Sequence, residues 1–448
     1  MKSLFSRNFL WGVATAAYQV EGAVREGNRG LSIWDTFSHT PGRTYMGHTG
    51  DVACNHYHLY LHDIALMSQI GVNAYRFSIA WPRIIPDGSG PTNPAGVDWY
   101  SRLVDALLEV GITPVATLYH WDLPQTLEER GGWRNRETAD YFADYAARVV
   151  DLLGDRVYLW ITLNEPQVVA EAGHLSGIHA PGIRDRQAAI TASHVLNLAH
   201  AKAVTAMRAI NRNNNFKVGI TLNLSKVYPA DPTNPDDVLS AEFVDARSNG
   251  WYLEPVFNKR YPEQVLERYA SNFLLPRLDT GDFDILSPPI DFLGINNYTR
   301  IVVRAVKPGE PWKCETVRPT GSTYTEMGWE VAPDGLRDIL LQVHEKYHPR
   351  EIMVTENGAA FDDRIDNDGK VNDDKRVEYL RSYIASAAEA IKAGVPLTGY
   401  FVWSFLDNFE WQHGYSKRFG IVYVDYRTQR RIIKKSGYWY QKWIASLK

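Results

Sequence analysis

The chain has 448 residues, 45% of them hydrophobic and 22% charged, and its 48 basic and 52 acidic side chains give a formal net charge of −4. This balance gives no indication of a nucleic-acid partner, and no charge block or low-complexity tract marks a disordered tail or a linker. Because α/β barrels often reach this length as one unit, we expect a single domain over residues 1–448.

The N-terminal segment and the cysteines bear on the compartment. Residues 9–17 loosely resemble the apolar part of a signal peptide, but Asn8 and Gly12 interrupt the apolar pattern and the stretch is marginal in length. No window approaches the roughly 18 apolar residues of a membrane span. Cys54 and Cys314, the two cysteines of the chain, are expected to be reduced thiols. The prediction is a cytoplasmic protein without a membrane partner.

Short apolar, β-branched or aromatic runs recur along the chain, each followed by a longer amphipathic segment. In chain order they span residues 9–22, 74–81, 113–121, 159–166, 218–224, 291–299, 351–358 and 397–405. One connecting segment, residues 140–155, places its apolar side chains on one stripe, as expected of a helix that covers a core. Runs that stay apolar at successive positions favour parallel strands that are buried on both faces and joined by helical crossovers.

These strand–helix units predict an α/β fold, a closed (β/α)8 TIM barrel. An open doubly wound sheet is the alternative, but it usually has a glycine-rich phosphate turn after its first strand, and none follows the first run here. Polar residues gather where the runs end, and the C-terminal ends of barrel strands form the active-site face. These residues are Gln19, Glu21, Arg76, His120, Asn164, Glu165, Asn296, Glu356 and Asn357.

Two glutamates of this set form a candidate catalytic pair. Glu165 ends the fourth run and Glu356 ends the seventh, and we expect those strands to face each other across the barrel mouth. Cleavage of a glycosidic bond needs one acid that protonates the departing oxygen and a second carboxylate that attacks the anomeric carbon or positions water. The acid needs a raised pKa and the nucleophile a nearby cation, for which Arg76 is the candidate. The structural alternative is a pair of carboxylates in unrelated salt bridges.

A histidine pair indicates a rival function from another class. The sequence "HEKYH", from His344 to His348, matches the zinc-metallopeptidase pattern of two ligands one helical turn apart. However, Pro349 biases His348 away from the helical region, and no third ligand is evident. We therefore predict no metal site here.

Three further alternatives are weaker. Residues 364–375 resemble a calcium loop but have cations at its first and last ligand positions, so we expect a solvated turn. The spacing of His56, His58 and His62 does not fit one helical face. A carbohydrate-binding module without catalysis, such as a lectin, would not need the paired glutamates.

Ten motifs in chain order resemble glycoside hydrolase family 1, the β-glucosidase family, in its bacterial type. They are "FLWGVATAAYQVEG", "SIWDTF", "YRFSIAWPRI", "TLYHWDLPQ", "TLNEP", "APG", "FLGINNY", "TEMGWE", "VTENG" and "WSFLDNFEW…GYSKRFG". The resemblance implies a (β/α)8 barrel and a retaining double displacement without a cofactor. The implied substrates are cello-oligosaccharides, as in cellulose degradation, aryl and alkyl β-glucosides, and also β-galactosides and β-fucosides. The oligomeric state stays open.

The resemblance also implies the catalytic roles. Glu165 in "TLNEP" would be the acid/base and Glu356 in "VTENG" the nucleophile. Arg76 would keep the nucleophile ionised, and Tyr298 would donate a hydrogen bond to it.

Further residues would bind the substrate by the same resemblance. Asn296 would line the subsite that holds the glycone. Trp403 would stack beneath the sugar ring, and Trp329 would face the aglycone. The glycone hydroxyls would be held by Gln19, His120, Asn164, Glu410 and Trp411, and the predicted set is completed by Trp121 and Phe419.

The chain departs from the family pattern at two positions. Gln167 follows "NEP" where the family commonly has Trp, and Asn297 stands where it commonly has Tyr, so the aglycone preference is open. Relatives that take 6-phosphorylated glycosides have serine at the position of Glu410, then a lysine and a tyrosine that hold the phosphate. Here Lys417 is present, but Glu410 and Phe419 flank it. An ionised Glu410 would repel a phosphate, so a 6-phospho-β-glucosidase is the less favoured alternative.

Overall fold

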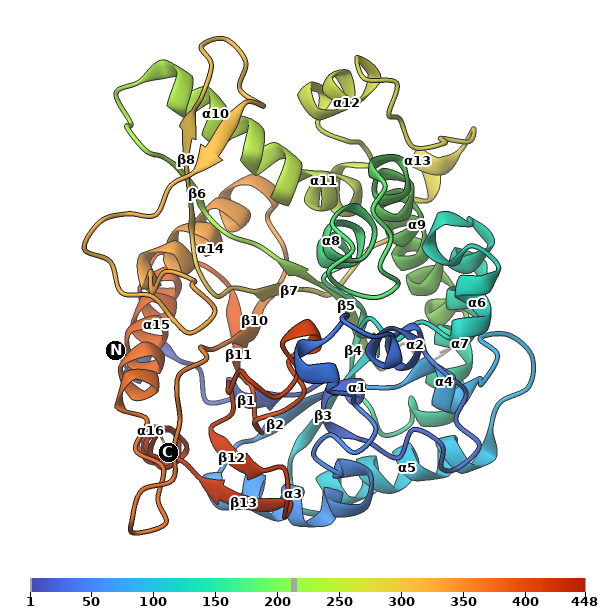
Figure 1. Ribbon diagram of the computed structural model, residues 1–448, viewed down its shortest axis with the longest axis vertical. Coiled ribbons are helices and arrows are strands. Elements are labelled where there is room, and N and C mark those ends of the chain that lie inside the picture. The colour runs from blue at the N-terminus through green and yellow to red at the C-terminus, as the bar shows by residue number, and fades with distance from the viewer. Residues whose placement is uncertain (1, 211–215, 448) are drawn as a thin grey trace.

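The computed structural model describes residues 2–210 and 216–447, and a closed barrel of parallel strands lies at its centre (Figure 1). The barrel strands are β1 (Leu10–Ala14), β2 (Ala74–Ser78), β3 (Thr113–Tyr119), β4 (Leu159–Asn164), β5 (Lys217–Asn223), β7 (Phe292–Asn296), β10 (Ile352–Asn357) and β11 (Leu397–Trp403). They follow one another around the barrel in the order β1-β11-β10-β7-β5-β4-β3-β2. The predicted (β/α)8 barrel is confirmed, and each predicted run overlaps one of these strands.

The strands are apolar at successive positions because both of their faces are covered. Every residue of β2, β4, β7 and β10 is buried. The ends of β10 and β11 approach each other so closely that a Cβ at Gly358 would lie 1.6 Å from the carbonyl oxygen of Trp403. Only glycine fits there, and this close approach fixes the chain that leaves β10.

Long amphipathic helices form the outer layer (Figure 1). They are α3 (His56–Ile70), α5 (Pro94–Glu109), α7 (Glu137–Leu153), α9 (Arg186–Ile210), α14 (Pro333–Tyr347), α15 (Asp374–Lys392) and α16 (Lys435–Ala445). The helix predicted over residues 140–155 is α7, whose Phe142, Tyr145 and Val149 are buried. Its apolar stripe packs on the barrel, as the periodicity predicts.

Shorter elements lie in the segments that connect the strands and helices. They include α1 (Ala17–Val20), α2 (Ile33–His39), η2 (Tyr45–Gly47), α4 (Trp81–Ile84), α6 (Gln125–Glu129), η3 (Gly132–Arg134), α8 (Pro166–Val168), the π-helix η4 (Val169–Leu175) and η6 (Trp411–His413). Between β5 and β7 lie β6 (Val227–Pro229), α10 (Pro235–Asp245), the π-helix η5 (Ala246–Gly250), α11 (Trp251–Asn258), α12 (Glu263–Ala270) and α13 (Asp282–Ile285). Outside the barrel, β6 forms a small sheet with β8 (Ile301–Ala305) and β9 (Cys314–Thr316). A hairpin of β12 (Val422–Asp425) and β13 (Arg430–Ile433) precedes α16, and η1 (Lys2–Leu4) opens the chain.

The first predicted run is only partly a strand. The prediction that the first strand continues through residues 16–22 was wrong, because β1 ends at Ala14 and the chain turns into α1. The hydroxyl oxygen of Ser78 accepts a hydrogen bond from the backbone amide of Ala17 at 2.7 Å and so holds the start of this turn. Gln19 therefore reaches the barrel mouth from a helical turn.

The motifs of the alternative functions have ordinary structural roles. His348 ends α14 with a φ of 47°, so it lies beyond the helix, as expected from Pro349. Asp366 closes a turn by accepting hydrogen bonds from the amides of Asp368 and Lys370, both at 2.9 Å. Over residues 2–210 and 216–447, no cluster of three or more His, Cys, Asp or Glu side chains could hold a metal ion, and no helix is long and apolar enough to cross a membrane.

Candidate functional site

Glu165 lies where the chain leaves β4 and enters α8. Its φ of 50° is in the left-handed region, which is costly for a residue with a Cβ and is often found at functional sites. The side chain is buried, and Asn296 donates a hydrogen bond to Oε1 at 2.7 Å. Burial and the charge of Glu356 raise the pKa of Glu165 to about 8. A carboxyl with this pKa keeps its proton at neutral pH.

Glu356 is buried near the end of β10 and has stronger donors around it. Arg76, from β2, donates to Oε1 at 2.5 Å, and the hydroxyl of Tyr298 donates to Oε2. Burial raises the pKa of Glu356, while Arg76 and Tyr298 act in the opposite direction. The two predicted carboxyls therefore lie in different environments, and only Glu356 is in direct contact with a cation.

Asn164 links these groups and sets the protonation of His120. Its Oδ1 accepts hydrogen bonds from Arg76 at 2.6 Å and from Asn296 at 3.1 Å. The amide nitrogen must then face His120, where it lies 3.0 Å from Nε2. Burial and Arg76 hold the pKa of His120 well below its usual range, so the ring is neutral and its proton is on Nδ1. This N–H has no partner among the described residues and can donate to a ligand.

Gln19 and Glu410 present further unsatisfied polar groups. The amide nitrogen of Gln19 donates to the carbonyl oxygen of Phe409 at 2.8 Å, and its Oε1 is buried without a partner in the described chain. Burial and the charges of Glu356 and Glu165 raise the pKa of Glu410 to about 8. Burial and the two nearby carboxyls therefore favour a protonated Glu410 at neutral pH, in contrast to the expectation that it is ionised. A protonated Glu410 can both donate and accept hydrogen bonds.

Aromatic rings line the same region. The ring of Trp403 lies 5.8 Å from that of His120 at an interplanar angle of 22°, and Trp121 lies 4.6 Å from Trp411. Trp121 and Trp411 also have positive φ values, 78° and 46°, so strained backbone concentrates around the mouth, as at Glu165.

A second aromatic group lies beside Tyr298. The rings of Tyr298 and Trp329 are 5.2 Å apart, and Phe419 lies 6.0 Å from Trp329. The contacts above and these aromatic pairs place the residues predicted for catalysis and substrate binding around one barrel mouth.

Comparison with known proteins gives the family. The model of glycosyl hydrolase family 1 matches residues 1–448. The chain belongs to this family. It is 48% identical to β-glucosidase A of Acetivibrio thermocellus, over 99% of both chains, and 43% identical to a bifunctional β-D-glucosidase/β-D-fucosidase of Bifidobacterium breve, also over 99% of both. A solved family 1 β-glucosidase from Thermotoga maritima superposes with a TM-score of 0.95 at 50% identity, covering 99% of this chain and 98% of the other.

Two of the polar residues predicted at the strand ends of this family 1 glycoside hydrolase, Glu21 and Asn357, lie outside the site. Glu21 accepts hydrogen bonds from Arg83 at 2.9 Å and from the hydroxyl of Tyr100 at 2.5 Å. Asn357 donates to the carbonyl oxygen of Asn297 at 2.7 Å. Asn297 itself donates to the carbonyl oxygen of Leu224 at 2.8 Å and is fully buried, so this departure from the family pattern holds a loop rather than lining the entrance.

Sequence reasoning missed residues that act on the predicted ones. Asn223 ends β5, and its side chain lies close enough to Glu165 to act against the rise in the pKa of that carboxyl. Thr355 donates to the Oδ1 of Asn296 at 2.8 Å, which turns the Asn296 amide nitrogen toward Glu165. Asn223 could have been found from the sequence, because it is a polar residue near the end of the fifth run. Thr355 could not, because neighbouring residues of a strand point to opposite sides, so the residue next to Glu356 is expected to face away from the site.

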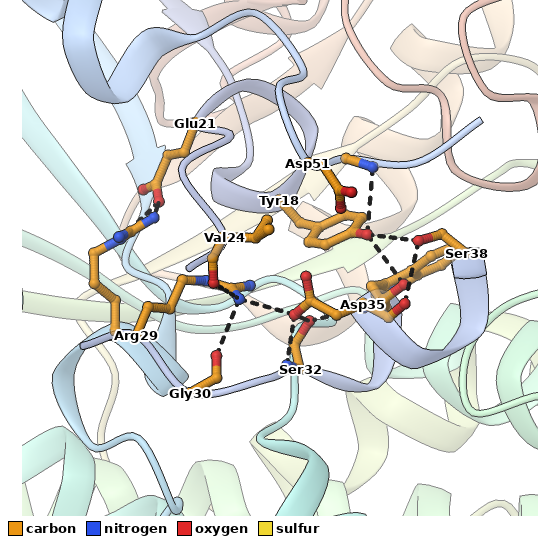
Figure 2. Close-up of polar contacts among 12 residues, drawn as sticks. Tyr18, Glu21, Val24, Arg29, Gly30, Ser32, Asp35, Ser38 and Asp51 are labelled. Atoms are coloured by element: carbon orange, nitrogen blue, oxygen red, sulfur yellow. Dashed lines mark hydrogen bonds and ion pairs between the residues drawn. The ribbon is translucent and has the colours of Figure 1, made fainter. Parts of the chain in front are cut away.

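A polar cluster holds α2 beside the mouth (Figure 2). Arg29 donates to the carbonyl oxygen of Gly30 at 3.0 Å and to Asp35 at 2.8 Å, and Asp35 also accepts from the amide of Ser32 at 2.6 Å. This capping arrangement fixes α2 at its N-terminus. It thereby places Trp34, whose ring lies 4.5 Å from that of Trp411.

A buried ion-pair network supports the loop that carries Glu410. Asp407, three residues earlier, accepts from Lys434 at 2.6 Å and from Arg418 at 2.6 Å. Lys434 also pairs with Asp363 at 2.5 Å, and all of these side chains except Arg418 are almost fully buried. The network ties the loop to the segment before α16.

Proposed function

We propose that this protein is a β-glucosidase that releases terminal, non-reducing β-D-glucosyl residues with retention of configuration. The observation that carries the proposal is the pair of buried carboxyls at the ends of β4 and β10, one protonated and the other in contact with Arg76. Two carboxyl groups with different environments are what acid and nucleophile roles require.

In the first step, a carboxylate oxygen of Glu356 attacks the anomeric carbon. The bond from that carbon to the leaving oxygen breaks, and the oxygen takes the proton of Glu165. Arg76 and Tyr298 stabilise the ionised nucleophile before the attack. In the second step, Glu165 removes a proton from water, the water oxygen attacks the anomeric carbon, and the glycosyl–Glu356 ester bond breaks.

The unsatisfied polar groups hold the sugar. His120 Nδ1 donates to one hydroxyl, Gln19 Oε1 accepts from another, and the carboxyl of Glu410 binds two neighbouring hydroxyls. The apolar face of the ring lies on Trp403. Trp411, Asn164, Asn296 and Trp121 complete the glycone subsite, with Trp329 and Phe419 toward the aglycone.

The substrates are cello-oligosaccharides and small aryl or alkyl β-glucosides, which places the enzyme in cellulose degradation. β-Galactosides and β-fucosides are also accepted; the name of the Bifidobacterium breve relative supports the fucoside activity. A 6-phosphate is disfavoured because Lys417 donates to the carbonyl oxygen of Glu326 at 2.7 Å and Phe419 is buried. Cys54 and Cys314 are free thiols, which supports a cytoplasmic location, and cell fractionation with an antibody tests it.

The test is hydrolysis of nitrophenyl β-D-glucoside, β-D-galactoside, β-D-fucoside and β-D-glucoside 6-phosphate, with the products followed by NMR. The expected result is turnover of the glucoside with β-glucose as the first product. First formation of α-glucose would contradict the double displacement, and a preference for the 6-phosphate would contradict the proposed substrate class.

A further inference from the structure

A second cavity, of about 490 Å³, lies among η4, α9, α10, η5, α11, α12 and the segment from β8 to β9. None of the residues assigned above to catalysis or sugar binding lines it. In Figure 1, α8, α9, α11 and α12 are drawn in the upper middle and right of the view, and α10 and β8 are drawn in the upper left. A cavity of this size accommodates a small ligand of one or two rings.

Aromatic side chains form much of its wall. Trp251 is buried, its indole nitrogen donates to Ser193 at 2.8 Å, and its ring lies 5.1 Å from that of Tyr269 in an edge arrangement. Across from them, the rings of Phe243 and Trp312 are 6.3 Å apart, and Trp312 is 37% exposed. The wall therefore offers flat apolar surfaces from its buried side to its rim, which favour a planar aromatic ligand.

Most charged side chains of the wall are cationic. The cations are Arg186, Arg247, Arg268 and Lys313, and the one anion among the lining residues is Glu171. Glu171 pairs with Arg247 at 3.4 Å, and Lys313 pairs with Glu310 at 2.7 Å. Arg186 and Arg268 have no ion pair with any described residue. The guanidinium of Arg268 lies 4.4 Å above the ring of Trp312, so positive charge is placed directly beside an aromatic surface. This combination favours an anion that also carries a flat ring.

Tyr252 supplies a free hydrogen-bond donor in the same wall. Its side chain is only 4% exposed, and its hydroxyl makes no hydrogen bond with the residues that the structure describes. Burial and the charge of Glu171 hold the pKa of Tyr252 well above its usual range, so the hydroxyl keeps its proton. The hydroxyl is not sealed off inside the protein but reaches the cavity, where it can donate to water or to a ligand. A ligand oxygen would satisfy it.

We propose that this cavity is a second ligand site, separate from the catalytic pocket, that binds a small planar aromatic carboxylate. The ring lies against Trp251, Phe243 and Trp312, and the carboxylate is attracted by Arg186 and Arg268. The hydroxyl of Tyr252 donates to a carboxylate oxygen. A neutral oligosaccharide would use the aromatic walls but leave the unpaired guanidinium groups without a counter-charge.

The test uses 2-naphthoate as the probe, titrated into the full-length protein by isothermal calorimetry. We expect one site with a Kd of about 1 mM or below, as for a well-bound small aromatic ligand. The neutral isostere 2-naphthamide should bind at least about fivefold more weakly, and 0.5 M salt should weaken naphthoate binding because the cations are partly exposed. Cellotriose should not displace naphthoate.

Three variants assign the binding to the cavity. Arg268→Gln should raise the naphthoate Kd about three- to fivefold, and Tyr252→Phe, which keeps the ring in place, at least about twofold. Arg304→Gln is the matched control, because Arg304 lies on the neighbouring β8 strand but outside the cavity wall. The naphthoate Kd of this variant should equal that of the wild type. Circular dichroism confirms that each variant is folded.

Four results would overturn the proposal: no naphthoate binding at millimolar concentration, equal affinity for the amide, displacement by cellotriose, or equal Kd values in Arg268→Gln, Tyr252→Phe and the control. Competitive inhibition of nitrophenyl β-glucoside hydrolysis with an inhibition constant equal to the Kd would also overturn it, since the ligand would then occupy the catalytic pocket. Calorimetry does not depend on turnover, so the proposal can be tested even if the proposed glucosidase activity is absent.

Discussion

Replacing Glu165 by Gln isolates the proton that the proposed mechanism needs. The amide has nearly the same size, and its oxygen can still accept the hydrogen bond that Asn296 makes to Oε1. In the wild type, burial and Glu356 raise the pKa of Glu165 to about 8. About nine in ten of these carboxyls are then protonated at pH 7 and about one in ten at pH 9.

The wild-type kcat/KM for an alkyl β-glucoside should therefore fall above neutral pH, with a midpoint near pH 8, and should be about tenfold below its plateau at pH 9. In Glu165→Gln, kcat/KM for the alkyl glucoside should fall by about 10²- to 10⁴-fold at pH 6.5. The loss should be far smaller for dinitrophenyl β-glucoside, whose leaving group departs without a proton. Initial rates at low substrate concentration over pH 5–10 measure both effects.

Glu109→Gln serves as the control, because Glu109 is exposed at the end of α5, remote from the mouth, and its profile should match the wild type. Equal losses on the alkyl and the dinitrophenyl substrate in Glu165→Gln would refute the assignment of Glu165 as the acid. Wild-type activity of Glu165→Gln on the alkyl glucoside would refute it as well.

Three further changes test other parts of the site. Arg76→Met removes the cation that lowers the pKa of the nucleophile, so the acidic limb of the kcat/KM profile should move to higher pH and kcat should fall by about 10²-fold; an unmoved limb would argue against this role. Glu410→Gln should raise the Tm by a few degrees at pH 9 but not at pH 4.5. The pKa of this carboxyl is raised to about 8 in the folded protein, so the free energy of unfolding falls as the pH rises from the pKa of the unfolded chain to about 8. Equal Tm shifts at both pH values would contradict this. Lys434→Met removes the buried cation that Asp363 and Asp407 share, leaving each with one arginine, and should cost about 3–5 kcal/mol in denaturant unfolding. Lys435→Met, whose side chain is 50% exposed, should cost less than about 1 kcal/mol. Equal costs would show that the buried network does not stabilise the loop.

The barrel could be predicted because its physical cause is local. Strands covered on both faces must be apolar throughout, so β4 and β10 are visible as runs that end in Glu165 and Glu356. Polar residues at those ends can only be tolerated where the strand opens into the mouth. The sequence position alone did not separate Glu165 from Glu21, which ends up paired with Arg83, because that outcome depends on which loops meet.

The remaining parts of the site depend on contacts between distant segments. The raised pKa of Glu410 results from two carboxyls on other strands, and the protonation of His120 depends on donors from Arg76 and Asn296 that orient Asn164. The α2 cluster around Arg29 likewise acts on the site only through Trp34. None of these relations leaves a periodic pattern or a spacing in the chain, so they follow only from the closed barrel.

The central claim, that Glu356 forms a bond to the sugar, is tested most directly by rescue of Glu356→Ala with azide. On dinitrophenyl β-glucoside, the variant should lose about 10⁴-fold or more in kcat, since Glu356 is the one carboxylate among the described residues that pairs with Arg76. Azide should enter the space left by the carboxylate, restore part of the rate and give α-glucosyl azide, which NMR identifies by its anomeric coupling. Near-normal turnover without azide, or a β-glucosyl azide product, would contradict the account.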